Sequence, residues 1–363
     1  MVIDLIAGAR PNFMKISPII DAINVARSAG KNIDFRLIHT GQHYDKNMSQ
    51  SFFSQLDIPE PHINLGAGGG TQAEQTSAIM IGYEKFLMKR KTDLCMVVGD
   101  VTSTMACSIV AQKMNVKVAH VEGGIRSGDW LMPEEINRIV TDSISNYFFT
   151  TSEVANKNLR KTGVDSERIF FVGNTMIDTL LKHRSRFKQP VIWHDYDLKE
   201  RNFIVLTLHR PSNVDEENQL TELINQILLH SKELPIVFPV HPRTAINIKK
   251  SGIKNNRLLM VEPLGYLEFN YLVENSFAVI TDSGGITEET TVMGIPCMTL
   301  RDSTERPETV QVGTNELLGT DPVKIKPALD KLFSGEWKKG GIPELWDGKA
   351  AQRIVDILLA LRF

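Results

Sequence analysis

Cysteine is scarce in this sequence, and its few copies form no pattern. The three cysteines, Cys95, Cys107 and Cys297, are odd in number and lie in apolar or helical segments without a C-x-x-C pair. Such cysteines are typical of buried thiols in a reducing compartment. A disulfide framework is therefore not expected, and we predict a cytoplasmic protein.

An excess of charge and a long hydrophobic run are also lacking. The 41 basic and 43 acidic residues give a formal net charge of -2, so no electrostatic argument favours nucleic acid or an anionic membrane as partner. The N-terminal MVIDLIAGAR has the pattern of a short strand, and no run approaches the length of a membrane span. We expect no nucleic-acid partner and no membrane association.

Common cofactor motifs are missing as well. Neither G-x-G-x-x-G nor G-x-x-x-x-G-K-[ST] occurs at a strand-to-helix turn, which argues against a tightly held dinucleotide and against a P-loop nucleotide hydrolase. H-E-x-x-H is absent too, so a dedicated zinc site is not expected. We predict no cofactor and no metal.

Short apolar runs alternate with longer amphipathic segments, and this rhythm starts twice. It predicts parallel sheets with helical crossovers, hence α/β architecture. We predict two Rossmann-like domains, residues 1–181 and 182–348, whose sheets face each other across a cleft. The helix expected at 349–363 should pack back on the first domain, and the polar stretch 182–202 is the linker candidate. The first series of runs is VIDLIA, FRLIHT, LCMVVGD, KVAHVEG, YFFTTSE and IFFVGN; the second is FIVLTLHR, PIVFPVHPR, LLMVEPLG, FAVITDSGG and PCMTLRD.

Polar residues follow these apolar runs at once or within a few positions. The carboxyl ends of parallel strands share one edge of a sheet, which is where ligands bind in open α/β folds. The sequence therefore predicts ligand sites at these edges. The residues are Arg10, His43, Asp100, Glu122, His209, His241, Ser283 and Arg301.

The segment TDSGGITEE, residues 281–289, is the better of two anion-site candidates. It follows a strand and opens a helix, so backbone N–H groups around Ser283, Gly284 and Gly285 suit a diphosphate. The alternative, equally open from this pattern, is that Asp282 or Ser283 is only a helix cap. Glu289 lies one turn into the helix, where its carboxylate could accept hydrogen bonds from ribose hydroxyls.

Two other segments offer weaker binding signals. In GARPNFMK, residues 8–15, Arg10 and Lys15 beside the first helix suit an anionic group, although an arginine here is as often a surface charge. In GYLEF, residues 265–269, Tyr266 and Phe269 read first as helix core positions and second as an aromatic wall for a base.

Carboxyl groups and a histidine carry the predicted chemistry. Asp100 and Glu122 each end an apolar strand, and Glu134 begins a helix in PEEINRIVTD. Singly, Asp100 could cap the next helix and Glu134 could favour a helix N-terminus. Together at one edge, three carboxyl groups would separate into acid and base roles. His209 could neutralise the charge of a leaving group.

An ordered set of segments resembles the non-hydrolysing UDP-N-acetylglucosamine 2-epimerases over nearly the whole chain. A full ordered set is far more specific than any one member. The segments are GARPNFMKISP, HTGQHYD, VVGDVTST, HVEGGIRSG, PEEINRIVTD, VGNTMIDTL, LHRPSNVD, PVHPR, TDSGGITEE and LRDSTERPETV.

This resemblance implies a GT-B-like fold, a homodimer, and interconversion of UDP-N-acetylglucosamine and UDP-N-acetylmannosamine for cell-surface polysaccharide precursors. By likeness of motif, Asp100, Glu122, Glu134 and His209 are the catalytic positions. The glycines of HVEGG are expected to let the backbone approach the sugar. The UDP-sugar-binding positions are Arg10, Lys15, His241, Phe269, Ser283, Gly284, Gly285, Glu289 and Arg301.

Departures from the family pattern leave alternatives open. Many bacterial members bind a second substrate molecule as an activator, for which Gln42, His43, Gln72 and Arg210 are the candidates here, without an arginine just before Gln72. The short SGDWLMP stretch and the serine of HRPSN resemble epimerases that act on UDP-2,3-diacetamido-glucuronic acid. A hydrolysing epimerase and a GT-B glycosyltransferase are the remaining alternatives.

Overall fold

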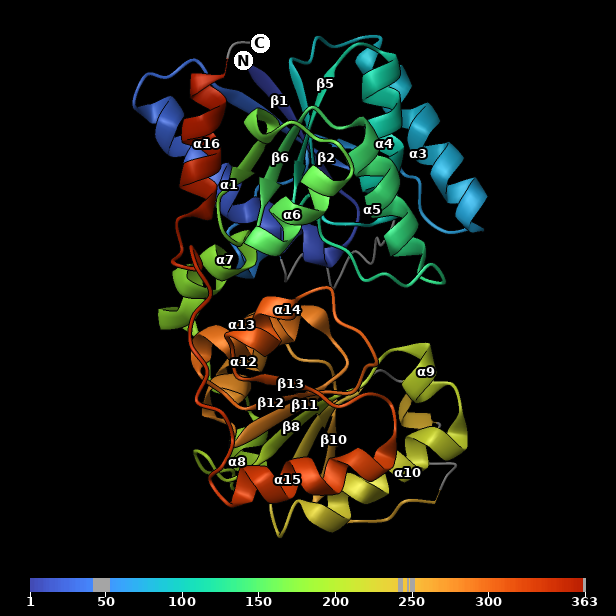
Figure 1. Ribbon diagram of the computed structural model, residues 1–363, viewed down its shortest axis with the longest axis vertical. Coiled ribbons are helices and arrows are strands. Elements are labelled where there is room, and N and C mark those ends of the chain that lie inside the picture. Colours follow the sequence, from blue (N-terminus) through green and yellow to red (C-terminus); the bar gives the residue numbers. More distant parts are fainter. Residues whose placement is uncertain (42–52, 241–243, 247, 249–251, 362–363) are drawn as a thin grey trace. The chain divides into compact units, whose positions relative to one another are not determined.

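The computed structural model describes residues 1–41, 53–240, 244–246, 248 and 252–361. The chain divides into two compact units (Figure 1). Unit 1 consists of Met1–Lys182 with Glu344–Phe363, and unit 2 of His183–Pro343. Each unit is built on its own parallel sheet, which confirms the predicted α/β fold class.

Unit 1 has a parallel sheet in the order β3-β2-β1-β4-β5-β6-β7. The chain order reverses between β1 and β4, so their carboxyl ends flank the switch point where ligands bind in doubly wound sheets. In the register, Leu5 of β1 lies opposite Leu37 of β2 and Met96 of β4. The strands are β1 (Val2–Ala7), β2 (Asp34–His39), β3 (Ile63–Asn64), β4 (Leu94–Val98), β5 (Lys117–Val121), β6 (Tyr147–Thr150) and β7 (Ile169–Phe171).

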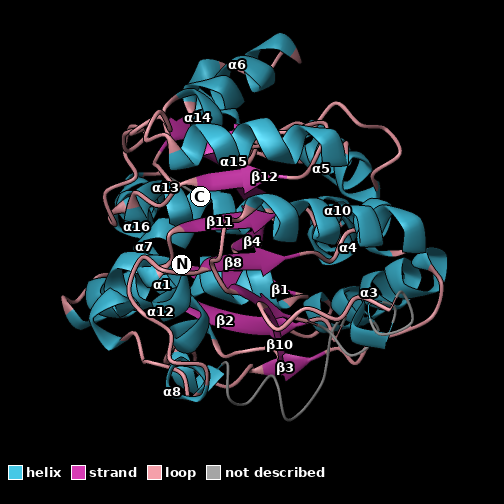
Figure 2. Cartoon of the chain, turned by 90° about the horizontal axis from the view of Figure 1, so that it is seen from below, coloured by secondary structure: helices cyan, strands magenta, loops and turns pink. Residues whose placement is uncertain are grey.

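Helices cover both faces of this sheet (Figure 2). Apolar side chains of α3 and α4 pack on one face against residues such as Ile6 and Val97, while α1 and α16 lie together on the other. The helices are α1 (Arg10–Ser28), α3 (Gln72–Leu87), α4 (Thr102–Lys113), α5 (Pro133–Ile144), α6 (Glu153–Lys161), α7 (Thr175–His183) and α16 (Ala350–Ala360), with the short 3-10 helix η1 (Ser166–Arg168).

Unit 2 repeats the same strand order in a smaller sheet, β10-β9-β8-β11-β12-β13. Its switch point therefore lies between β8 and β11. The strands are β8 (Ile204–Thr207), β9 (Ile236–Pro239), β10 (Leu258–Val261), β11 (Ala278–Thr281), β12 (Cys297–Thr299) and β13 (Asn315–Leu317).

The helices of unit 2 also pack on both faces of their sheet. Leu223 and Ile227 of α10 join Leu329 of α15 in one core with the strands, while α12, α13 and α14 lie on the other face. The helices are α9 (Pro211–Val214), α10 (Glu217–His230), α12 (Tyr266–Asn275), α13 (Gly284–Met293), α14 (Pro307–Gln311) and α15 (Ile325–Phe333), with η3 (Pro322–Lys324).

The polar stretch proposed as a linker is folded within unit 2. It forms the short helices η2 (Arg184–Arg186) and α8 (Ile192–Asp195). Trp193 contacts the rings of Phe203 and Tyr271 edge-on, with ring centroids 5.6 and 5.4 Å apart. Aromatic packing of this kind holds the stretch against the body of the unit.

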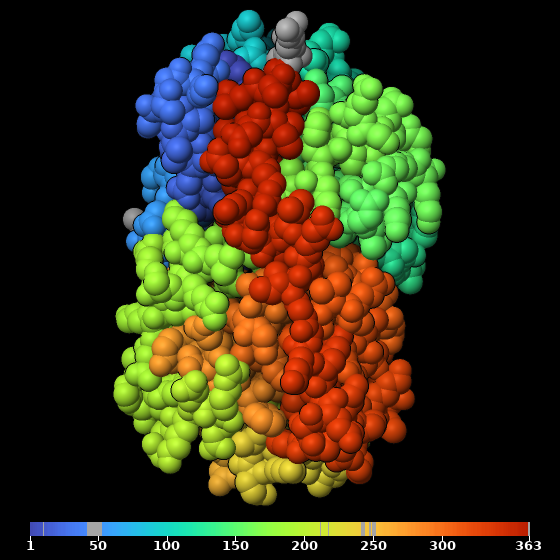
Figure 3. All heavy atoms as spheres, turned by 60° about the vertical axis from the view of Figure 1, so that its left-hand side comes forward, coloured from blue at the N-terminus to red at the C-terminus, as the bar shows by residue number. Residues whose placement is uncertain are grey.

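The C-terminal segment completes unit 1. Asp178 of α7 accepts the backbone N–H groups of Ala350 (3.1 Å) and Ala351 (2.7 Å), which caps α16, and the indole of Trp346 donates to the Thr151 carbonyl at 3.2 Å. Figure 3 shows this red segment on the surface beside the blue N-terminal residues. Unit 1 is thus assembled from both ends of the chain.

The three cysteines are buried thiols, and the described helices include no candidate membrane span. Cys95, Cys107 and Cys297 are buried and free, as predicted. In the described part of the chain, no helix combines the length and the apolar character that crossing a membrane requires.

Candidate functional site

The loop after β1 is tied to the end of β4 by Asn12. Its side-chain oxygen accepts the backbone N–H groups of Gly8 and Ala9, at 3.1 and 3.0 Å, and its amide donates to the Val98 carbonyl at 2.9 Å. One buried side chain therefore fixes both loops at the switch point. Arg10 begins α1 beside it, and its side chain lies outside the described structure.

Glu122 directly follows β5 and forms a buried ion pair. Its Oε2 lies 2.7 Å from Nζ of Lys15 on α1. The backbone of Glu122 has φ of 71°, a conformation that costs a non-glycine residue energy and clusters at functional sites. Gly99 passes beside the pair: a Cβ there would meet Lys15 Nζ at 3.3 Å, and φ is +69°. Lys15 thus compensates the charge of a buried carboxylate.

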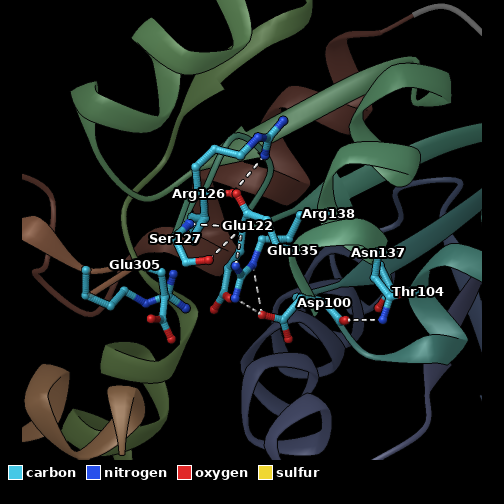
Figure 4. Close-up of polar contacts among 12 residues, drawn as sticks. Asp100, Thr104, Glu122, Arg126, Ser127, Glu135, Asn137, Arg138 and Glu305 are labelled. Carbon is cyan, nitrogen blue, oxygen red and sulfur yellow. Dashed lines mark hydrogen bonds and ion pairs between the residues drawn. The ribbon is translucent and has the colours of Figure 1, made fainter. Parts of the chain in front are cut away.

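Asp100 follows β4 and is held from α5. Arg138 donates to its Oδ2 through Nη2 at 2.6 Å and Nε at 3.0 Å, and Asn137 donates to its main-chain carbonyl at 2.8 Å (Figure 4). Helix α4 begins after Val101 without a side-chain cap, so the alternative that Asp100 caps this helix is wrong.

Glu134 and Glu135 have different environments although they are neighbours on α5. Glu134 is half-buried, and its carboxylate forms no hydrogen bond or ion pair with any described residue. Glu135 is buried and accepts hydrogen bonds from Arg138 Nη1 (2.6 Å) and from the backbone of Ser127 (2.9 Å) and Gly128 (3.1 Å). Burial alone would raise the pKa of Glu135, but these donors outweigh it and lower that pKa.

The glycine pair after Glu122 has a packing reason. A Cβ on Gly124 would lie 2.4 Å from the Ala155 carbonyl oxygen, and one on Gly123 would lie 3.0 Å from the Phe148 ring. Neighbours within unit 1 thus require glycine at both positions, and the approach of a sugar to this backbone stays a prediction.

In unit 2, Asp282 orients the histidine that follows β8. The carboxylate accepts the backbone N–H groups of His209 (3.0 Å) and Arg210 (2.9 Å) and the side-chain amide of Asn213 (3.0 Å), and its Oδ1 lies 2.7 Å from His209 Nδ1. Burial would raise the pKa of Asp282, but the bonds to His209, Arg210 and Asn213 lower it. His209 is 63% exposed, so its ring has one nitrogen on the aspartate and an accessible face.

The start of α13 combines helix amides with a buried cation. Ser283 is the N-cap but makes no side-chain cap bond, and Asp282 is engaged elsewhere, so the interpretation of either as a mere cap is wrong. Arg301 is 4% exposed and binds Glu305 through Nη2 at 2.6 Å, while its Nη1 has no partner among the described residues. A Cβ on Gly284 would lie 2.9 Å from Glu305 Oε1 and 3.6 Å from Arg301 Nη1. The arrangement suits an anion at the helix terminus.

Glu289 lies deeper in α13 and is almost fully buried. Burial, together with the charge of Glu288, raises the pKa of Glu289 to about 7, against hydrogen bonding by Tyr266 and Asn270. The Tyr266 hydroxyl donates to its Oε1 at 2.9 Å. Tyr266 is therefore a buried core residue with a polar role, while Phe269 is half-buried.

The remaining predicted positions are spread over both units. Gln72 is exposed at the start of α3, and the Arg210 guanidinium donates to the Asp282 carbonyl at 3.2 Å. Gln42, His43 and His241 lie outside the described residues. Among the residues that are described, no group of three or more His, Cys, Asp or Glu side chains could hold a metal ion.

Residues 26–359 match the family model for UDP-N-acetylglucosamine 2-epimerase, which is most of the chain. The chain belongs to the UDP-N-acetylglucosamine 2-epimerase family. The recognised resemblance is thereby confirmed, as is the assignment of an epimerase, an isomerase enzyme.

Relatives of this epimerase span it from end to end. The UDP-N-acetylglucosamine 2-epimerase of Methanocaldococcus jannaschii is 41% identical over 99% of each chain. The crystal structure of the M. jannaschii protein in complex with UDP-GlcNAc and UDP has a TM-score of 0.89 at 39% identity, covering 99% of this chain and all of that one. The UDP-2,3-diacetamido-2,3-dideoxy-D-glucuronate 2-epimerase of Pseudomonas aeruginosa is 38% identical over 99% of this chain and all of its own.

Three residues of this epimerase that orient candidate site side chains are not among those predicted from its sequence. Arg138 and Glu135 had a visible signal, because they are an i,i+3 pair on one helix face next to Glu134. The sequence suggests Asp282 only as a helix cap, since its contact with His209 joins positions 73 residues apart. Such a contact depends on strand order, which a local pattern does not contain.

Proposed function

We propose that this protein reversibly epimerises UDP-N-acetylglucosamine at C2 to UDP-N-acetylmannosamine, by elimination and re-addition of UDP through a glycal. The proposal depends on one observation: in each unit, polar side chains gather at the sheet edge formed by the carboxyl ends of the strands. One edge presents Asp100, Glu122 and Glu134; the other presents His209 beside the amide end of α13 and the buried Arg301. Each edge carries groups that the proposed reaction uses.

Unit 2 is proposed to hold the UDP moiety. The first-turn amides of α13 and Nη1 of Arg301 would bind the diphosphate, and Arg10 of unit 1 would add charge. His209, oriented by Asp282, would stabilise the negative charge that develops on the leaving oxygen. Glu289 would accept the ribose hydroxyls, with Phe269 near the uracil; Ser283, Gly284, Gly285 and His241 complete this proposed set.

Unit 1 is proposed to move the proton. The C2 hydrogen of the sugar is weakly acidic, so its direct removal is a poor route. If a carboxylate takes this proton while the C1–O bond breaks, the electron pair of that bond leaves on UDP and a neutral C1=C2 glycal remains. A second carboxyl group then returns a proton to the opposite face of C2, and UDP adds back at C1. Atoms and charge balance without an oxidant or a cofactor.

The three acids differ in ways that suit these roles. Glu122 is buried against Lys15, Asp100 is held by Arg138 with 30% of its side chain exposed, and Glu134 has no described partner. Unequal partners and unequal exposure suit a division of these carboxyl groups into an acid and a base.

The test is incubation with UDP-N-acetylglucosamine in deuterated water. We expect deuterium at C2 of both nucleotide sugars, with UDP retained, when the mixture is followed by NMR and mass spectrometry. Free N-acetylmannosamine with equimolar UDP would contradict the proposal and identify a hydrolysing epimerase. Inertness until an acceptor is added would identify a glycosyltransferase.

A second substrate is favoured by one specific relative. The P. aeruginosa protein whose name gives UDP-2,3-diacetamido-2,3-dideoxy-D-glucuronate is nearly as similar as the M. jannaschii protein, at 38% against 41% identity. The same assay with that uronate decides between substituents at C3 and C6: the preferred substrate is the one with the larger kcat/KM.

The proposal extends to the setting of the enzyme. We place the enzyme in the cytoplasm, where its three buried thiols stay reduced. We also propose that it is a homodimer, as the resemblance of its motifs implies. Activation by a second substrate molecule would involve Gln42, His43, Gln72 and Arg210, and would produce a sigmoidal dependence of rate on substrate concentration.

A further inference from the structure

Arg138 is a buried arginine shared between two carboxylates. Its side chain is 3% exposed, and it reaches Asp100 Oδ2 with Nη2 and Nε while Nη1 reaches Glu135 Oε2 at 2.6 Å. Figure 4 shows the guanidinium between the two acids. A planar guanidinium donates in several fixed directions at once, whereas a lysine ammonium is a point charge on a flexible stem. Only arginine can bridge both groups with this geometry.

The contact with Asp100 selects one of its two oxygens. Both donors of Arg138 go to Oδ2, and Asn137 holds the main-chain carbonyl of the same residue. Oδ1 forms no hydrogen bond with any described residue. Helix α5 therefore fixes the rotation of the Asp100 carboxylate and leaves Oδ1 as the atom able to exchange a proton.

The contact with Glu135 reaches the loop of residues 122–132. Besides Arg138, Glu135 accepts the N–H groups of Ser127 and Gly128 and, at 3.1 Å, the Ser127 hydroxyl. Ser127 Oγ in turn accepts the N–H of Asp129 at 3.2 Å. This loop leads from Glu122 to the start of α5, so one guanidinium holds both the Asp100 carboxylate and the docked loop.

We propose that Arg138 is a positioning residue for the C2 proton transfer: it presents Oδ1 of Asp100 to the sugar and, through Glu135, makes that orientation depend on the docked 122–132 loop. This rests on the proposed function, because it assigns to Asp100 the proton on one face of C2. A misplacement of about 1 Å at a reacting group can reduce a rate about 100-fold, so the guanidinium need not touch substrate to control the reaction.

The test measures exchange of the C2 hydrogen from each epimer separately. In Arg138→Met, net epimerisation should fall about 100-fold in both directions, within the range for a lost general acid or base. Loss of the C2 hydrogen to deuterated water should fall comparably from only one epimer, the one whose C2 face Asp100 serves. From the other epimer it should stay within about threefold of the parent rate, and the Kd for UDP should also change by less than about threefold.

Two further variants separate positioning from folding. Arg138→Lys keeps the positive charge but lacks the planar guanidinium with its several fixed N–H donors. This variant should therefore have no more than about a tenth of the parent kcat. Glu135→Gln keeps the shape and weakens the anchor of the loop, so we expect an intermediate fall in kcat, about tenfold, with the same one-sided exchange. Arg36→Met is the matched control: it removes another largely buried guanidinium of unit 1, paired with Asp4 at 2.7 Å, and should leave kcat unchanged.

Three results would overturn the positioning role of Arg138, and a fourth would overturn the proposed function itself. Equal slowing of exchange from both epimers, or full activity of Arg138→Lys, overturns the positioning role. That role is also overturned if Glu135→Gln retains the parent kcat while folding normally by circular dichroism. If the unmodified protein exchanges the C2 hydrogen of neither epimer, the proposed function fails before any variant is compared, and the inference fails with it.

Discussion

At the scale of the residue, the buried carboxyl groups differ in what compensates their charge. Glu122 has the ammonium of Lys15, and Asp282 has backbone and side-chain N–H groups together with His209. Glu289 has the neutral hydroxyl of Tyr266 and a second acid, Glu288, nearby. A carboxyl group buried without a positive partner holds its proton to higher pH. Glu289 is therefore the group of the site expected to titrate near neutrality.

The first prediction concerns Glu289→Gln and the free energy of unfolding without ligand. The pKa of Glu289 rises from its ordinary 4.5 to about 7 in the folded protein. Between these values the folded state keeps a proton that the unfolded state has lost, so stability falls as pH rises. This difference in the pKa of Glu289 between the unfolded and folded states corresponds to about 3 kcal/mol of stability. Urea denaturation should show parent and variant nearly equal at pH about 4.5, and the variant about 3 kcal/mol more stable at pH 8.

A partner variant supplies the control. Tyr266→Phe removes a hydrogen bond that lowers the pKa of Glu289, so the pH at which stability levels off should move upward. A difference between parent and Glu289→Gln that is constant from pH 5 to 8 would contradict the prediction, because it would show that Glu289 ionises in the same range in both states.

At the scale of the element, the glycines at the two ends of α13 have separate reasons. A Cβ on Gly284 at the start would lie 2.9 Å from Glu305 Oε1, so that side chain would have to shift, whereas Gly294 at the end has φ of +71° and open space around its α-carbon. Burial would raise the pKa of Glu305, but Arg301 and Arg306 hold it at about 2, so this carboxylate stays charged against Arg301. Side chains of unit 2 crowd the start of α13, and helix termination shapes its end.

The second prediction compares Gly284→Ala with Gly294→Ala. The first pushes a methyl group against Glu305, the carboxylate that pairs with Arg301, so the Kd for UDP should rise about tenfold or more in calorimetry. The second forces alanine into a left-handed C-cap and should cost about 1 kcal/mol of stability, while the Kd for UDP changes less than about twofold. Equal effects of the two substitutions on UDP affinity would refute the assignment of the helix start to the diphosphate.

Elements were predictable where the local pattern decides them. The run VIDLIA forms β1 and the run FAVIT contains all of β11, because buried parallel strands are continuous apolar runs. Residues at the strand ends were predicted for the same reason: Asp100, Glu122 and His209 each follow a strand directly or within two residues. The cap interpretations of Asp100 and Asp282 failed because the partners, Arg138 and His209, come from distant segments brought close only by the sheet order.

At the scale of the whole molecule, the chain leaves unit 1 at Lys182, builds unit 2 without interruption, and returns at Glu344. Unit 2 is thus continuous in sequence and contains its own sheet and core. Unit 1 depends on both ends of the chain, because α16 packs against α1 and is capped by Asp178. The two units should therefore differ in their ability to fold alone.

The third prediction uses fragments. Residues 183–343 should unfold cooperatively and bind UDP with a Kd within about tenfold of the full chain, since the proposed diphosphate and ribose contacts lie almost wholly in this unit. Residues 1–182 alone should be poorly structured, because removal of α16 exposes the apolar face of α1; a fusion of 344–363 after residue 182 through a flexible linker should restore folding. Circular dichroism, urea titration and calorimetry measure all three fragments. A folded 183–343 that does not bind UDP would refute the nucleotide site in unit 2, and a stable 1–182 would show that α16 is dispensable.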